Sequence, residues 1–398
     1  MILGAGVYAL IGPAAAHAGN TLWLAFIFAG LTAGLTAYAY ARLARLAPRN
    51  SPEFQYTALA FGARPGFVAG TLMLLADVLA AATVTLGFGG YLEHLAGTPT
   101  AGNALALIVV LGAILWVGVE QSIAVAIVLT GLEALGLVFV IAVGLPSWSG
   151  TDYLTAPRGL TGVSSAAAII FFAYLGFDEL GNFAEEMRRP DRDLPKALFV
   201  SMVTTTVIYV LVALSTVAVV DAERLGASAA PLALVVGGVL GKHADMVLSL
   251  LALAATANTV LLLLASSARS IYGMATAGVL PARLAHVGRT AVPGNATVLV
   301  LALQAVLVGV GTLRQVAAIT DAVVLVSFMF VNASLCWLAA RRRTSARGAR
   351  RAGEMLIPSL AFVLCTWLLL HAGVPSVVAA AGLTVVLAVL PKSAGTMS

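Results

Sequence analysis

Twelve apolar runs, each about 17–25 residues long, fill most of this 398-residue chain and constrain its fold more than any other feature. None of them alternates apolar and polar residues with period 2, so they favour helices over barrel strands. Only 10% of the residues are charged and 61% are hydrophobic, too few polar residues to cover a surface in water. Inside a bilayer, backbone polar groups must bond within helices or a closed barrel. The sequence therefore predicts an all-α polytopic membrane protein.

The twelve runs define the expected membrane segments. We place them at residues 1–17, 21–41, 66–92, 104–119, 122–145, 163–184, 197–220, 245–268, 295–311, 316–339, 355–371 and 374–390. The first is shorter than the roughly 20 residues of a full span. We expect that its N-terminal half is missing from the sequence, through a late start codon or a truncation.

Basic residues in the loops predict the orientation. With the N-terminus inside, 18 of the 22 lysines and arginines fall in cytoplasmic loops or the C-terminal tail. This bias predicts a multi-pass protein of the cell membrane with both termini cytoplasmic. The basic residues are spread along one membrane face, so nucleic acid is not an expected partner. The densest run, 341–351, either determines topology alone or also contacts anionic lipid.

Neither a metal centre nor a catalytic cluster is visible. Cys336 and Cys365 lie inside predicted helices, and the five histidines lack metal-ligand spacing. The titratable residues do not converge as an enzyme would need, and the scattered polar residues do not line a channel. We expect no enzyme activity, no cofactor and no metal.

Two apolar segments are interrupted. The first interruption is at Gly4, Ala5 and Gly6, near the start of the chain. The second is at residues 171–178, which read FFAYLGFD and place a glycine and an acid inside a membrane segment. Interrupted segments in corresponding positions of two halves point to the substrate site of a secondary transporter.

Four stretches resemble those of the amino acid–polyamine–organocation (APC) transporter superfamily. They are GAGVYALIGPAAAHAG at 4–19, the loop at 41–62, FAYLGFDE with AEEMRRPDRDLPKAL within 172–198, and SSARSIYGMATAGVLPARLAHVGRTAVPGNAT at 266–297. The first and third stretches together are a specific match to this superfamily, whereas any one stretch alone would be a weak match.

The resemblance implies a LeuT-type fold in one transporter domain, 1–398. It has a 5+5 inverted repeat, with repeat one at 1–145, repeat two at 163–340, discontinuous helices 1 and 6, and helices 11 and 12 at 355–390 outside the repeats. The implied function is secondary active transport of amino acids by alternating access, with proton coupling or exchange.

The resemblance also implies a substrate site between the two interruptions. The amides of Gly4, Ala5 and Gly6 would hold a carboxylate, since a helix N-terminus is partly positive. The carbonyls of Phe172, Ala173 and Leu175 would hold an amino group, and Phe171, Tyr174 and Phe177 would shape or gate the pocket. Close helix packing is the alternative reading of the glycines. Ala5 replaces a hydroxyl residue common in the family, which leaves backbone groups alone for the carboxylate.

Glu133, in the middle of segment 5, is the expected coupling residue, because acids buried in membranes are costly and often functional. It would take up and release a proton, with Ser266 or Ser267 of segment 8 as its neighbour. Two alternatives are open: a sodium site built from an ionised Glu133 and these serines, or a purely structural hydrogen bond.

Asp77, Asp178 and Asn258 are secondary candidates. Asp77 in segment 3 would pair with a cationic substrate or, as we favour, bond another helix. Asp178 would belong to a moving half-helix, and Asn258 would line the path or bond another helix. We expect a neutral amino acid as substrate, with a cationic amino acid or a small amine as the alternative. A substrate sensor built on a transporter fold is the non-transporting alternative.

Overall fold

The fold of this chain was examined in a computed structural model. It describes residues 4–46, 51–117, 123–178, 180, 189–276, 280–287, 293–341 and 348–389. Those residues contain helices and no strand. The ends of several predicted segments, including residues 1–3, 118–122 and 181–184, lie outside the described residues.

The helices of the N-terminal half are α1 (Ala5–Ala18), α2 (Leu22–Leu43), α3 (Pro52–Phe61), α4 (Ala63–Ala96), α5 (Thr100–Val117) and α6 (Ile123–Gly144). The next group is α7 (Gly159–Ile170), the 3-10 helix η3 (Phe171–Tyr174), α9 (Pro190–Val219), α10 (Ala222–Ala227) and α11 (Pro231–Leu240). The last group is α12 (Lys242–Thr276), α13 (Gly294–Val310), α14 (Leu313–Arg341), α15 (Gly348–His371) and α16 (Val374–Val389). Each of the twelve predicted segments overlaps one of these helices.

Seven apolar helical stretches of at least 18 residues are long enough to cross a membrane, among the described residues. One of them, Ala5–Leu43, contains both α1 and α2, and five further apolar helices are shorter. These lengths support a polytopic membrane protein. Three helices were not predicted, α3, α10 and α11, because 6–10 residues are too few to span a bilayer and lie in segments that read as loops.

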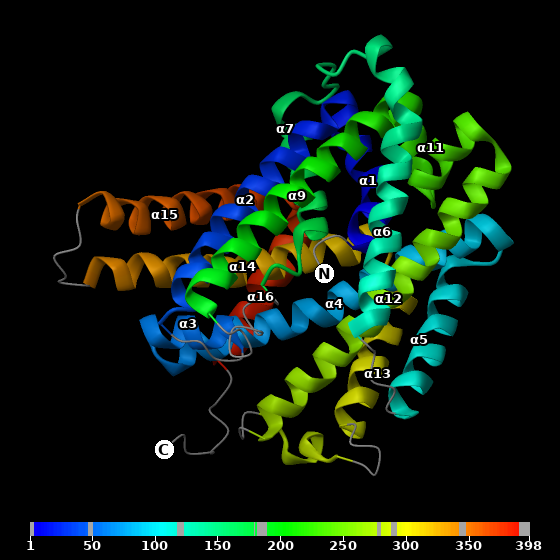
Figure 1. The fold of residues 1–398 in the computed structure, drawn as a ribbon. Helices are drawn as coiled ribbons and strands as arrows, with labels where there is room; N and C mark the ends of the chain where they lie inside the picture. The colour runs from blue at the N-terminus through cyan, green and yellow to red at the C-terminus, as the bar shows by residue number, and fades with distance from the viewer. Residues whose placement is uncertain are drawn as a thin grey trace.

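Most of the helices pack against partners that are far apart in sequence. In Figure 1, α2 and α9 lie side by side, and α14 lies beside α15, the helix that follows it in the chain. In addition, α1 packs against α7, α4 against both α12 and α14, and α5 against α13. Eleven of the fourteen residues of α1 are buried, so other helices enclose it and it cannot face lipid along its length. The start of α1 and the end of α7 therefore meet inside the protein.

Candidate functional site

The helix of segment 6 ends in the middle of an apolar run. After Ile170 the backbone tightens into η3, and Leu175 is extended with φ −63° and ψ 153°. Gly176 follows with φ 104°, a conformation that residues with a Cβ rarely adopt. The Gly176 amide donates to the Asp178 carboxylate at 3.0 Å. The Leu175 amide still donates to the Phe172 carbonyl at 3.1 Å, but the regular helical bonds stop here, so the Ala173 carbonyl needs another partner.

The first helix begins beside this interruption. Gly4 is extended (φ −149°, ψ −171°) and α1 starts at Ala5, so the first amides of α1 have no partner within the helix. A Cβ placed on Gly6 would stand 2.8 Å from the Ala173 Cα and 3.0 Å from the Phe172 ring. Gly6 is therefore a close-approach glycine between two helix ends, which explains why a larger residue is absent there.

Tyr209 of α9 joins the two helix ends. Its hydroxyl donates to the Ala173 carbonyl at 3.1 Å and accepts from the Gly4 amide. The tyrosine is fully buried, and its ring packs against those of Phe26 and Tyr174, with centroid separations of 5.6 and 5.4 Å. A donor of one helix end and an acceptor of the other thus lie close enough to share one hydroxyl group.

Sequence reasoning missed Tyr209. It stands in an apolar run with no glycine or charge beside it. The one available signal was general, because a buried tyrosine hydroxyl in a membrane helix needs a hydrogen-bond partner. Sequence alone does not identify that partner.

The aromatic residues of the interruption point in different directions. The Tyr174 hydroxyl donates to the Phe26 carbonyl at 2.9 Å, toward α2. Phe171 and Phe177 both contact the ring of Phe328 on α14, at centroid separations of 6.1 and 5.3 Å.

Tyr40 of α2 completes this aromatic cluster. Its ring contacts Phe177, Phe328 and Tyr56, each at 5.7–5.8 Å between centroids. Its hydroxyl donates to the buried Glu53 carboxylate at 2.6 Å. The cluster thus joins α2, α3 and α14 to the residue that follows Gly176.

Glu133 lies close to α1 and α12. The Tyr8 hydroxyl donates to its backbone carbonyl at 2.8 Å, and the Asn258 side chain hydrogen-bonds its carboxyl group. The residue is 3% exposed, and Oε1 has no hydrogen-bond partner in the described part of the chain. Two of the candidate residues, Glu133 and Asn258, are therefore brought together.

The remaining candidates lie elsewhere on these helices. Ser267 is fully buried and its hydroxyl lacks a partner among the described residues, whereas Ser266 is half-buried. Both are two turns or more beyond Asn258 on α12. Asp77 is half-buried on α4, and Asp178 is 5% exposed just after Gly176.

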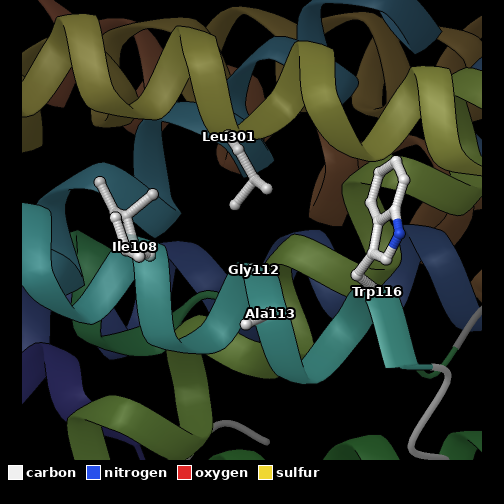
Figure 2. Close-up of a pocket in the computed structure, with 6 residues that line it drawn as sticks. Ile108, Gly112, Ala113, Trp116 and Leu301 are labelled. Atoms are coloured by element: carbon white, nitrogen blue, oxygen red, sulfur yellow. The ribbon is translucent and has the colours of Figure 1, made fainter.

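A surface groove between α5 and α13 is a different kind of feature. Figure 2 shows Leu301 of α13 pointing toward α5, with Ile108 and Trp116 on either side. The groove has a volume of about 330 Å³, is lined by Ile108, Val109, Gly112, Ala113, Trp116 and Leu301, and is open to the outside. Val109 is 71% exposed, as expected for a side chain facing lipid. An apolar groove of this kind offers nothing to bind charged groups.

Comparison with known proteins identifies the family. The family described as amino acid permease matches residues 1–391. The chain belongs to the amino acid permease family. This places it in the APC superfamily, as the sequence motifs predicted, and makes it a multi-pass membrane transporter of amino acids.

Individual relatives agree with this assignment. The branched-chain amino acid permease BcaP of Bacillus subtilis is 27% identical over 395 residues, covering 94% of this chain and 85% of its own length. An uncharacterized transporter of Mycobacterium bovis is 30% identical, covering 84% of this chain and 76% of its own. The vacuolar cationic amino acid transporter 4 of Arabidopsis thaliana is 28% identical, covering 82% of this chain and 61% of its own length. The chain thus spans about six tenths of the length of the Arabidopsis relative.

Proposed function

We propose that this permease binds the amino and carboxyl groups of a free amino acid between the start of α1 and the interruption after α7. The observation that carries the proposal is the Tyr209 hydroxyl, which bonds the Gly4 amide and the Ala173 carbonyl together. The Gly4 amide and the Ala173 carbonyl, which their own helices leave without a partner, are thus within reach of one hydroxyl group. A zwitterion presents an acceptor and a donor of its own across a similar span.

The helix ends supply the electrostatics for this binding. The amides of Gly4, Ala5 and Gly6 are at the partly positive end of α1, which suits a carboxylate. The carbonyls of Phe172, Ala173 and Leu175 are at the partly negative end of α7 and η3, which suits an ammonium group. Phe171, Tyr174 and Phe177 enclose this space with apolar surface. No charged side chain is required.

We infer that the fold is the LeuT type, with repeats at 1–145 and 163–340 and helices 11 and 12 at 355–390 outside them. The packing supports this, because α2 lies against α14 as α9 lies against α6. Likewise α4 packs on α14 as α12 packs on α6. An inverted repeat predicts these matching contacts, because it relates α2 to α9, α4 to α12 and α14 to α6. Two helices discontinuous near the midplane would let one bundle rock against the other for alternating access.

We propose that Glu133 couples transport to a proton. It is buried, bonded to Asn258, and adjacent to α1 through Tyr8. Rearrangement of α1 would therefore change its surroundings. The sodium alternative uses an ionised Glu133, with Ser266 and Ser267 as further oxygen ligands. Exchange of one amino acid for another needs neither cation.

A neutral amino acid is our first proposal for the substrate. BcaP is named for branched-chain amino acids, and Ala5 and Ala173 are small apolar residues at the proposed site. Cationic amino acids are the second candidate, because the Arabidopsis relatives are named as cationic amino acid transporters and Asp77 supplies an acid on α4. Neutral and cationic amino acids both fit one site, because the site would bind the amino and carboxyl groups that they share and would recognise the side chain separately.

We further propose that the protein resides in the cell membrane with both termini cytoplasmic, and that it has no enzymatic activity. The bias of basic residues supports the orientation. Cysteine labelling of loop residues from either side of intact cells would test it. Labelling of the 145–158 loop from inside alone would contradict it.

Transport itself is tested with purified protein in liposomes. Radiolabelled leucine, arginine and putrescine should be compared for uptake, with thermal stabilisation as a measure of binding. We expect leucine to be bound and transported. Stabilisation by putrescine alone would rule out the zwitterion site, and stabilisation by leucine without uptake would indicate a sensor.

A further inference from the structure

An acid on α14 has surroundings that neither the motifs nor the family assignment explain. Asp321 stands nine residues into α14 and is fully buried. Neither of its carboxyl oxygens has a hydrogen-bond partner in the described part of the chain. Buried acids normally have a base, a metal or several donors beside them. Asp321 therefore differs from Glu133, which is bonded to Asn258.

Among the described residues, no hydrogen bond or ion pair joins Asp321 to a group on the helices packed against α14. Arg42 pairs with Glu354, Tyr40 donates to Glu53, and Tyr174 and Cys365 contact hydrogen-bonding groups of α2. Asp77 of the neighbouring helix α4 is itself an acid and would not compensate a negative charge at position 321. A carboxylate at position 321 would thus have no counter-ion from these side chains, and an uncompensated charge inside a membrane protein is costly.

The space at the carboxyl group selects the ligand. Both oxygens are closed to a water-sized sphere, so neither an ammonium group nor a hydrated ion contacts them in this conformation. A proton needs no additional volume. It neutralises the acid without a partner side chain.

The position of Asp321 on α14 connects it to the substrate region. Phe328 follows seven residues later, two turns along the same helix face. Its ring contacts Phe171 and Phe177 on the two sides of the segment 6 interruption. The preceding residue, Thr320, lies 3.4 Å from Thr83 of α4 between hydroxyl oxygens. A movement of α14 away from these neighbours would open the acid to water.

We propose that Asp321 is a second proton-binding site of this permease, neutral while α14 is packed as observed and able to release its proton when that packing opens. The part of this proposal that connects proton release from Asp321 to amino acid transport rests on the proposed function. The occupation of the site by a proton stands on the burial and the missing partners.

Infrared spectroscopy of the purified protein in lipid tests the occupation directly. A protonated carboxyl group has a carbonyl band that a carboxylate lacks. At neutral pH we expect a band that is lost in Asp321→Asn and kept in Thr320→Val, the adjacent control. A spectrum unchanged by Asp321→Asn would overturn the proposal, whatever the transport result.

Transport assays test the link to the cycle. Asp321→Asn resembles the protonated form, so we expect leucine exchange to persist while accumulation driven by a pH gradient is lost. Asp321→Glu should retain both. If Asp321→Asn fails to fold, the infrared comparison uses Asp321→Glu instead, and a protonated-carboxyl band that is the same in Asp321→Glu and the parent overturns the proposal. If the parent protein transports no amino acid, the proposed function fails while the infrared assignment stands.

Discussion

The Tyr209 hydroxyl donates to the Ala173 carbonyl at 3.1 Å, across 36 residues of sequence. The same hydroxyl accepts from the Gly4 amide. One side chain of α9 therefore satisfies a backbone group at each of the two helix ends that would hold an amino acid. If these two helix ends hold an amino acid as we propose, the hydroxyl occupies the positions of the substrate's own amino and carboxyl groups.

Removing this hydroxyl should strengthen substrate binding. In Tyr209→Phe the Gly4 amide and the Ala173 carbonyl lose a partner in the empty protein, so a bound amino acid gains both. We expect the dissociation constant for leucine to fall about 2- to 10-fold, the equivalent of one net hydrogen bond. Isothermal calorimetry measures it. Tyr174→Phe is the control, because its hydroxyl bonds Phe26 instead. Weaker binding in Tyr209→Phe would mean that the hydroxyl holds the substrate rather than replacing it.

A methyl group at position 6 should separate the two helix ends. The Cβ of Gly6→Ala would lie 2.8 Å from the Ala173 Cα, which is backbone and cannot rotate away. Such overpacking costs about 1–3 kcal/mol of folding free energy. We expect a lower thermal midpoint and loss of leucine uptake.

Gly34→Ala on α2 is the matched control for this change. Its Cβ would meet no atom within 4 Å, so uptake should persist. Equal uptake by the two variants would show that the close approach at Gly6 is not needed for transport.

Neutralising Glu133 should uncouple transport from the proton. Glu133→Gln keeps the shape of the side chain and a group that can bond Asn258, but it cannot exchange a proton. We expect accumulation driven by an imposed pH gradient to disappear in proteoliposomes while leucine exchange continues. Glu223→Gln, an exposed site on α10, should behave like the parent. If Glu133→Gln accumulates leucine as strongly as the parent, Glu133 is not the proton carrier.

The bond between Tyr40 and Glu53 should stabilise the closed aromatic cluster. In Tyr40→Phe the ring contacts remain, but the buried carboxylate loses its donor at 2.6 Å. A buried acceptor left without its donor costs about 1–3 kcal/mol, which thermal unfolding would detect. We also expect faster hydrogen–deuterium exchange of the Phe177 amide, a measurement that leaves every ring of the cluster in place.

Tyr38→Phe is the matched control on the same helix. Tyr38 is half-buried and lies outside the aromatic cluster, so its loss should change neither measurement. If Tyr40→Phe is as stable as the parent, the Tyr40–Glu53 bond does not stabilise the aromatic cluster.

The local features of the site were accessible from sequence because each depends on residue type. Only glycine readily adopts φ 104° at position 176, and only glycine permits the approach at position 6. The partners were not accessible in the same way. Ser266 and Ser267 were expected beside Glu133, yet the hydrogen-bonded side chain is Asn258, two turns or more earlier on α12. Helix rotation and tilt decide such contacts, and a uniformly apolar segment does not reveal them.

By itself, the sequence determined that this chain is a helical membrane protein interrupted at Gly176, because apolar length and glycine are local properties. It also determined the family, through motifs that span both halves. The tertiary structure alone decided that Tyr209 lies between Gly4 and Ala173 and that, among the described residues, no group hydrogen-bonds the Asp321 carboxyl. Both facts depend on which helix faces approach each other, and that is set by packing among segments of nearly equal hydrophobicity.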